Sequence, residues 1–210
     1  MAVSIADGLM EARKLQLLIF RNNNNEKFME GSICKIMNNL PWSPNLKVVD
    51  FSRSRIKEDQ FETFNKNLFK LISMSRTIEY LNLSGVGHVF DKFKHDTFKA
   101  IAQNQSLKYL DLSHCANERD ECDIKRLAHC IAINSESPRG KLEELILNGF
   151  FANHDQFYKL IERLWVTEQL KEKWFGDEEL AKTMSLDTKI RKYVCRIKTL
   201  SINKCKFTEN

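Results

Sequence analysis

Proline and glycine are scarce, with 3 and 7 residues in a chain of 210. Such a composition excludes a collagen-like or linker-rich protein. No window approaches the roughly 18 apolar residues that a membrane-spanning helix needs. Glu11, Arg13 and Lys14 precede the apolar run 15–20, whereas a secretory signal places its basic residues first and small residues at a cleavage site. These absences predict a soluble protein of the cytoplasm, with no membrane association.

Neither sign of charge dominates, since 33 Lys and Arg stand against 28 Asp and Glu, for a net charge of +5. The basic stretches 189–192 and 198–206 enrich the C-terminal end, but interleaved acidic residues favour a solvated surface over a nucleic-acid site. Six cysteines without a secretion signal indicate reduced, mostly buried thiols and not disulfides.

An apolar template, L-x-x-L-x-L-x-x-(N/C)-x-L, recurs along the chain. Six matches place strands near residues 15–20, 46–51, 78–83, 107–112, 142–147 and 197–202. Their starts are 29 to 35 residues apart except for the last step, which is 55. That long step predicts either a degenerate repeat at 170–175, in which Lys173 occupies a core position, or a helical insertion.

Between the templates the apolar period changes from two to about 3.6 residues, which is typical of amphipathic helices. The predicted helical faces lie within 61–72, 98–102, 124–131 and 157–164. A single strand–turn–helix unit cannot cover its own apolar side, so neighbouring units must stack. The sequence therefore predicts one α/β solenoid domain over 1–210. It would be a horseshoe arc of about six to seven repeats, with a parallel sheet on the concave side and helices on the convex side.

The segments LNLSGV, LDLSHC, LILNGF and LSINKC resemble leucine-rich repeats over residues 15–210. The long helical part of each unit is similar to the ribonuclease-inhibitor type. The resemblance implies a binding function, because this group of proteins includes nucleotide-sensor tails, small-GTPase regulators, actin regulators, ribonuclease inhibitors and bacterial effectors.

Strand residues between the core leucines line the concave side of such a fold. The third template position places Tyr80 beside Tyr109, and tyrosines offer a large contact area at low entropic cost. The alternative is that the two rings only pack on each other between ordinary solvated residues. The predicted partner-binding residues are Tyr80, Tyr109, Asp50, Asn82, Asp111, Arg53, His114, Glu144 and Asn148.

No residue pattern supports catalysis, a cofactor or a metal. His114, Cys115, Cys122, His129 and Cys130 lie close in sequence but match no familiar zinc spacing. Asp50 and Asp111 fall two strands apart, about 10 Å on an open surface, with no nucleophile or phosphate loop near them in the pattern.

The sequence thus predicts a non-catalytic scaffold or adaptor that binds a protein partner through the concave sheet. The alternatives are a stoichiometric inhibitor or regulator of an enzyme or small GTPase, and a bacterial effector acting on host proteins. The chain stops after the strand of its last repeat, so the open C-terminal repeat edge is a predicted site of self-association.

Overall fold

The computed structural model describes residues 8–9, 11–22, 32–87, 95–115, 124–153, 160 and 197–208. The degenerate repeat predicted at 170–175, the basic stretch 189–192 and all of the predicted helical face 157–164 except Leu160 lie outside the described residues. Among the described helices, none has the length and apolar character to cross a membrane.

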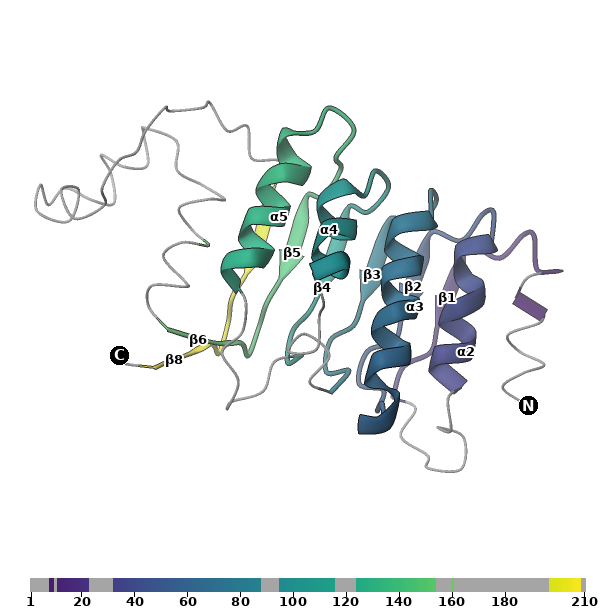
Figure 1. The fold of residues 1–210 in the computed structure, drawn as a ribbon, viewed down its shortest axis with the longest axis horizontal. Coiled ribbons are helices and arrows are strands. Elements are labelled where there is room, and N and C mark those ends of the chain that lie inside the picture. Colours follow the sequence, from purple (N-terminus) through teal and green to yellow (C-terminus); the bar gives the residue numbers. More distant parts are fainter. Residues whose placement is uncertain are drawn as a thin grey trace, which may run out of the picture.

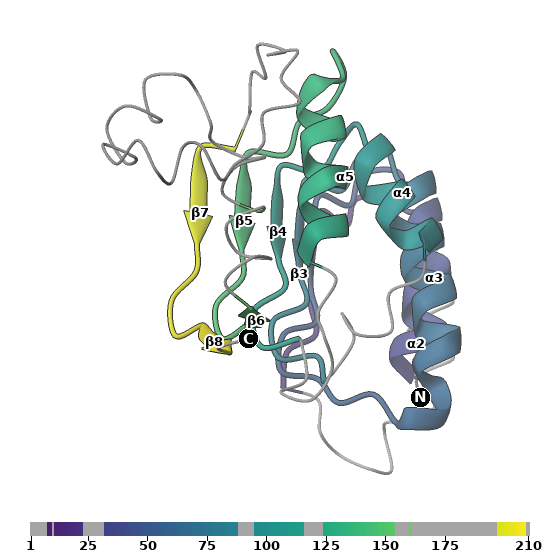
Figure 2. The same cartoon turned by 60° about the vertical axis from the view of Figure 1, so that its left-hand side comes forward.

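A six-stranded parallel sheet forms one layer of the molecule, in the order β1-β2-β3-β4-β5-β7. Figure 2 shows its later strands standing side by side. Each strand occupies the third to fifth positions of one template, so the predicted parallel sheet is confirmed. The strands are β1 (Leu17–Ile19), β2 (Val48–Asp50), β3 (Tyr80–Asn82), β4 (Tyr109–Asp111), β5 (Glu144–Ile146) and β7 (Thr199–Ser201).

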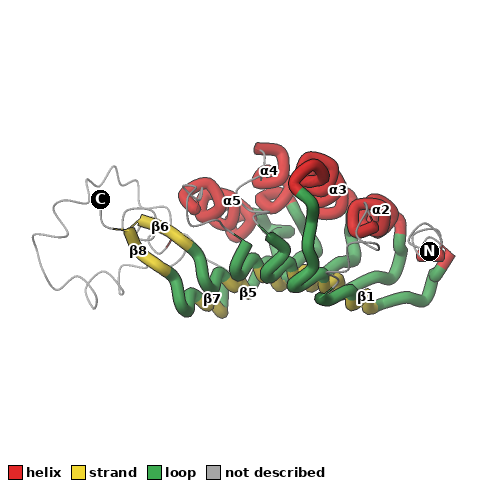
Figure 3. Tube along the Cα trace, turned by 90° about the horizontal axis from the view of Figure 1, so that it is seen from below, coloured by secondary structure: helices red, strands yellow, loops and turns green. Residues whose placement is uncertain are grey.

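Helices form the second layer and lie on one face of the sheet (Figures 1 and 3). Along the layer each α-helix packs against the next. Short 3-10 helices, η1 (Leu40–Trp42) and η2 (Glu58–Gln60), precede and follow β2 in the sequence. The α-helices are α2 (Ser32–Asn39), α3 (Phe61–Met74), α4 (His95–Gln103) and α5 (Ile124–Glu136). The opposite face of the sheet is covered by no described element.

The core lies between these layers and consists of the template residues at positions one, four and six. In the four central units these side chains are at most 4% exposed. Burying each one stabilises the fold by about 1.5–3 kcal/mol, and only stacked neighbours can bury them. They are Leu46, Val49, Phe51, Ile78, Leu81, Leu83, Leu107, Leu110, Leu112, Leu142, Leu145 and Leu147.

A second, two-stranded parallel sheet pairs β6 (Phe151–Asn153) with β8 (Lys206–Thr208). The sequence pattern did not predict it, because both strands are three residues long and follow the turns after β5 and β7 without a template of their own. The chain therefore continues past β7 in a further strand and does not end in an unsupported turn.

Every unit leaves its strand through the same left-handed turn. The eighth template position has a positive φ in all six units, at Asn22, Arg53, Gly85, His114, Gly149 and Lys204. Glycine accommodates this conformation freely, whereas other residues lose about 1 kcal/mol or more there. A Cβ on Gly149 would collide with the imidazole of His114, whereas a Cβ on Gly85 would make ordinary contact with Cγ of Arg53, at 3.6 Å. Gly149 thus makes room for the larger side chain of the preceding unit.

The ninth template position follows that turn and lies at the end of the core. Where it is polar, the side chain donates a hydrogen bond to the preceding strand: Ser54 Oγ to the Phe20 carbonyl, and the thiols of Cys115 and Cys205 to the carbonyls of Leu83 and Leu147. The described cysteines are all free thiols. Burial raises the pKa of Cys34 to about 11, so this thiol stays protonated at neutral pH.

Buried asparagines connect successive helical segments on the other side of the core. Asn67 Nδ2 donates to the Cys34 carbonyl at 2.7 Å, and Asn104 Nδ2 donates to the Ile72 carbonyl at 2.6 Å. Asn134 Nδ2 in turn donates to the Asn104 carbonyl at 2.7 Å. Each amide donates to a backbone carbonyl of the preceding unit and thereby joins the two helical segments.

Replacing Asn134 with alanine should lower the free energy of unfolding by about 2–3 kcal/mol, because several buried backbone groups lose their partner. Asn134 is 1% exposed, and its Oδ1 also accepts a hydrogen bond from the Leu142 amide. Urea unfolding followed by circular dichroism measures the change. The matched control is Asn38→Ala, at an exposed helical position, which should change stability by less than about 0.5 kcal/mol. Equal effects of the two substitutions would contradict the structural role of Asn134.

Candidate functional site

Tyr80 and Tyr109 form a stacked pair at the centre of the uncovered face of the sheet. They are direct neighbours in the register of β3 and β4. Their ring centroids are 4.0 Å apart and the ring planes are inclined by 8°. Both side chains are half-buried. The predicted adjacency is thus observed, and so is the packing of the two rings on each other, the alternative that the sequence left open.

Burial raises the pKa of Tyr109 far above its usual value, and the Tyr80 hydroxyl and the Asp111 carboxylate raise it further. The Tyr109 hydroxyl lies 3.4 Å from Oδ2 of Asp111. Tyr109 therefore stays neutral across the accessible pH range. It acts as a hydrogen-bonding, largely apolar surface and not as a base.

We use "open face" for the side chains at the third and fifth template positions, which project from the sheet away from the helices. The third positions form one register row: Leu17, Val48, Tyr80, Tyr109, Glu144 and Thr199. Its first four members are apolar or aromatic. At the same end of the sheet, Leu17 is 49% and Ile19 is 52% exposed. The third-position row of the open face is therefore apolar or aromatic over β1–β4 and polar over β5 and β7.

Asp50, Asn82 and Asp111 are neighbours on β2, β3 and β4, as the sequence predicts. They were expected to flank the tyrosines as solvated groups, but the three residues are only 1%, 8% and 8% exposed. One side-chain oxygen of each accepts a 2.9 Å hydrogen bond from the backbone amide two residues later, at Ser52, Ser84 and Ser113. Their first role is thus to hold the turn that follows the strand.

Arg21 is a member of this site that the sequence analysis missed. Its guanidinium lies 2.7 Å from Oδ2 of Asp50 on the neighbouring strand. Burial by itself raises the pKa of Asp50, but hydrogen bonds from Arg21 and Ser52 outweigh it and hold that pKa below its ordinary value of 3.8. Only the register of β1 against β2 brings the two side chains together, because Arg21 and Asp50 occupy different template positions.

We call the seventh and eighth template positions the rim, because they border the open face where the strands end. The rim carries Arg21, Arg53, His114 and Lys204 and no acidic residue. Arg53 and His114, both predicted binding residues, are exposed here. An open depression of about 460 Å³ lies at the rim. It is lined by Arg21, Asn22, Ser52, Arg53, Asn82, Ser84 and Asp111.

The last two predicted residues lie on the polar end of the open face. Glu144 is exposed on β5, next to Tyr109 in the register. Asn148 is half-buried at the rim. Its Oδ1 accepts hydrogen bonds from the Asn203 amide at 2.7 Å and from the Ser201 hydroxyl at 2.8 Å. Asn148 therefore joins the turns after β5 and β7, whereas Glu144 is available to solvent.

The opposite border of the sheet balances its own charge. The second template positions alternate in sign, and Lys108 Nζ lies 2.7 Å from Glu79 Oε2 while Lys198 Nζ lies 2.9 Å from Glu143 Oε2. Each such exposed pair contributes little stability, about 0–1 kcal/mol. This border therefore carries both signs of charge, whereas the rim has basic residues and no acidic ones.

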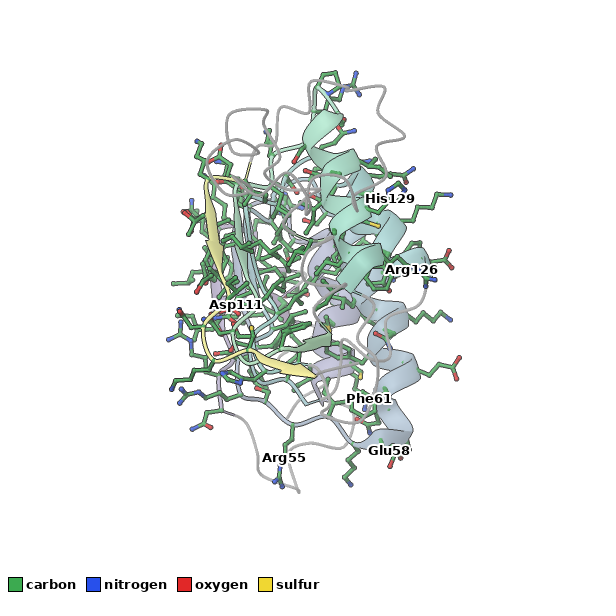
Figure 4. The ribbon with its side chains drawn as sticks, turned by 90° about the vertical axis from the view of Figure 1, so that its left-hand side faces the viewer. Arg55, Glu58, Phe61, Asp111, Arg126 and His129 are labelled. Atoms are coloured by element: carbon green, nitrogen blue, oxygen red, sulfur yellow. The ribbon has the colours of Figure 1, made fainter. Side chains whose placement is uncertain are left out.

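The five His and Cys residues considered for zinc do not form a described site. The Cys115 thiol is buried and bonded to the Leu83 carbonyl, Cys122 lies outside the described residues, and His129 is exposed on the helical layer. In Figure 4, His129 and Arg126 point outward from α5, far across the molecule from Asp111 on the sheet. Within the described part of the chain, no three His, Cys, Asp or Glu residues could together hold a metal ion.

A scan against protein-family models finds no match to the sequence. A search of the curated proteins finds none either. Among solved structures, the chain is similar to the tropomodulin C-terminal domain of Caenorhabditis elegans, with a TM-score of 0.55 and 15% identity over 84% of this chain and 99% of that one. It is also similar to leiomodin-1 actin-binding site 2, with a TM-score of 0.46 and 16% identity over 86% and 98% of the two chains.

The likeness to the tropomodulin domain supports a repeat solenoid as the fold. It also shows that the predicted ribonuclease-inhibitor-like subtype is wrong. That prediction assumed a regular long helix in each unit, whereas the described α-helices contain 8, 14, 9 and 13 residues. Strand spacing repeats faithfully here and helix length does not, so helix length was a poor guide to the subtype.

Acid should unfold the protein partly through Asp50. A carboxyl whose pKa is lowered in the folded state stabilises it above the unfolded pKa, and this contribution is lost as the pH falls through the folded pKa. Asp50→Asn keeps the turn, because Asn82 fills the equivalent position, and should flatten the loss of stability below about pH 4. Urea unfolding between pH 6 and pH 2 measures this.

Arg21→Gln provides the complementary variant. It should lower stability at pH 6 only slightly, because the Arg21 guanidinium is exposed to solvent. The difference from the unmodified protein should shrink towards pH 2, where Asp50 is protonated. Identical pH profiles for all three proteins would refute the coupling of Arg21 and Asp50.

Proposed function

We propose that this chain is a non-catalytic leucine-rich-repeat scaffold, acting inside the cell, that binds a protein partner through the open face. In this proposal residues 1–210 form one horseshoe-shaped domain of about six to seven repeats, and the open face is its concave side. The observation that carries the proposal is the Tyr80–Tyr109 stack, set in a row of apolar side chains that no described element covers.

The tyrosine pair has the properties of a binding anchor. The two rings hold each other in place, so ligand binding costs little further side-chain entropy. Their strands are central in the sheet and are hydrogen-bonded on both sides, which gives the pair a rigid support. Tyrosine is among the residues that most often dominate binding energy at protein interfaces.

The apolar surface beside the tyrosines supports the same proposal. Leu17 and Ile19 are half exposed on the open face, and Val48 lies between them and Tyr80 in the register. Single exposed apolar residues need no explanation, but a contiguous apolar surface on a rigid sheet is typical of an interaction site. A protein partner would remove it from water and gain about 25 cal/mol for each Å² of apolar area buried.

Chemistry at the open face favours binding over catalysis. Asp50 and Asp111 are committed to backbone amides, and Asn82 lies between them in the sheet. A stoichiometric inhibitor would use the same face and would differ only in the partner that it occludes.

Replacing Tyr80 and Tyr109 together with serine should weaken partner binding by about 30-fold or more, the effect expected for a central aromatic anchor. Cross-linked capture followed by mass spectrometry identifies partners, and titration of the purified partner measures the affinity. Purified actin, the ligand after which the leiomodin-1 segment is named, is titrated directly in parallel.

The control is Phe69→Ser, which removes a 38% exposed aromatic side chain from α3 on the helical layer. It should leave the affinity within about two-fold, as expected for a surface substitution away from the interface. Circular dichroism must show both variants folded. Equal affinities for the unmodified protein and the tyrosine variant would contradict the proposal.

We also propose self-association through the outer edge of β7. In the described part of the chain β7 pairs only with β5, and Leu200 and Ile202 are half-buried there. An unpaired edge strand offers backbone groups to a second chain. Light scattering should show a concentration-dependent dimer, and Ile202→Pro should abolish it by removing a donor of the outer edge, since the equivalent Leu147 amide of the preceding unit donates to the next strand. A monomer at all concentrations would refute this arrangement.

A further inference from the structure

The charges that border the open face are distributed unequally, and this indicates the chemistry of the partner. At the start of the strands, lysines alternate with glutamates and pair with them across neighbouring units. At the rim, the twelve positions from six units include Arg21, Arg53, His114 and Lys204 but no aspartate or glutamate. A partner that lies across the strands therefore meets positive charge along one border only.

Two acidic residues near the rim, Asp50 and Asp111, neutralise only part of this positive charge. Asp50 is 1% exposed and paired with Arg21, and one oxygen of Asp111 is held by the Ser113 amide. Arg53, in contrast, is exposed and has no acidic partner within the described residues. It lines the rim depression together with Arg21. Its guanidinium is thus an exposed positive charge at the border of the open face.

Arg53 occupies the left-handed position of the turn in its unit. Its φ is +56°, a conformation that glycine adopts at the same position in two other units and that Asn22, His114 and Lys204 adopt in the remaining three. An arginine there costs the fold about 1 kcal/mol or more relative to glycine. Its side chain lies against Gly85, which keeps it directed along the rim.

We propose that the open face binds an acidic protein segment that lies across β1–β4. Its apolar or aromatic side chains would contact the row from Leu17 to Tyr109, and its carboxylates would face the rim and pair with Arg53. This inference rests on the proposed function and adds to it the charge and the orientation of the partner.

The spacing of the rim residues favours carboxylates along a chain over a single phosphate group. Arg53 and His114 belong to units two strands apart, which is about 10 Å at the usual strand spacing. One phosphate cannot reach both. An extended peptide presents side chains on one side at intervals of about 7 Å, so two acidic residues can span the same distance. The adjoining apolar row also matches a peptide better than an inorganic anion.

The test is selection of binders from a library of displayed random 12-residue peptides on the complete chain. The enriched peptides should carry net negative charge together with at least one aromatic or large aliphatic residue. The tightest peptide is then synthesised with a fluorophore and titrated at 50 mM and 300 mM salt. Its affinity should fall at the higher salt concentration, as exposed ion pairs are screened.

Two matched variants locate the charge contact. Arg53→Gly removes the guanidinium and suits the left-handed backbone, so the variant should remain folded. The affinity of this variant for the acidic peptide should fall by about 5- to 30-fold. Arg76→Gly removes an exposed arginine from the loop before β3, at the other border of the sheet, and should change the affinity by less than about two-fold.

The outcomes separate this inference from the proposed function. Enriched peptides that are neutral or basic, yet need Tyr80 and Tyr109, would leave the proposed function standing and refute the acidic partner. Acidic peptides insensitive to Arg53→Gly would also refute it, because they would bind elsewhere. If no peptide is enriched, or if binding does not depend on the tyrosines, both the inference and the proposed function are contradicted.

Discussion

The parallel register of adjacent strands is the constraint on which the rest of the structure depends. It places the same template position of each unit beside that of the next, so Tyr80 meets Tyr109 and Asp50 meets Asn82. The rows of buried leucines, alternating charges and left-handed turns all follow from this one alignment. A slip by one residue would turn the core side chains of a strand to the open face.

The turn at the end of each strand decides which groups remain available for binding. Asp50, Asn82 and Asp111 accept hydrogen bonds from the following backbone amides, which removes most of their capacity to bind a ligand. The same turn lifts Arg53 and His114 into solvent at the rim. The turns thus engage the carboxylates of Asp50 and Asp111. Over β1–β4 the surface that remains exposed is apolar and aromatic, with basic residues at the rim. The proposed acidic partner is complementary to what remains.

Much of the fold was predictable because it repeats. A two-residue period marked each strand, and the recurrence of the template showed that neighbouring units stack. Elements that occur once were harder to predict. Helix α2 has no repeated pattern to identify it, and β6 and β8 are stabilised by pairing with each other over three residues. Short segments of this kind carry too little periodicity for a prediction, since their partner is distant in the sequence.

The sequence by itself determined the parallel order of the units, the identity of the core side chains and the adjacency of the two tyrosines, because each depends only on repeat spacing. Only the tertiary structure decided the use of the polar residues. Burial of Asp50, its ion pair with Arg21 and the fit of Arg53 against Gly85 involve groups 29 to 32 residues apart. Their roles depend on solvent exposure and on distances between units, and spacing along the chain specifies neither quantity.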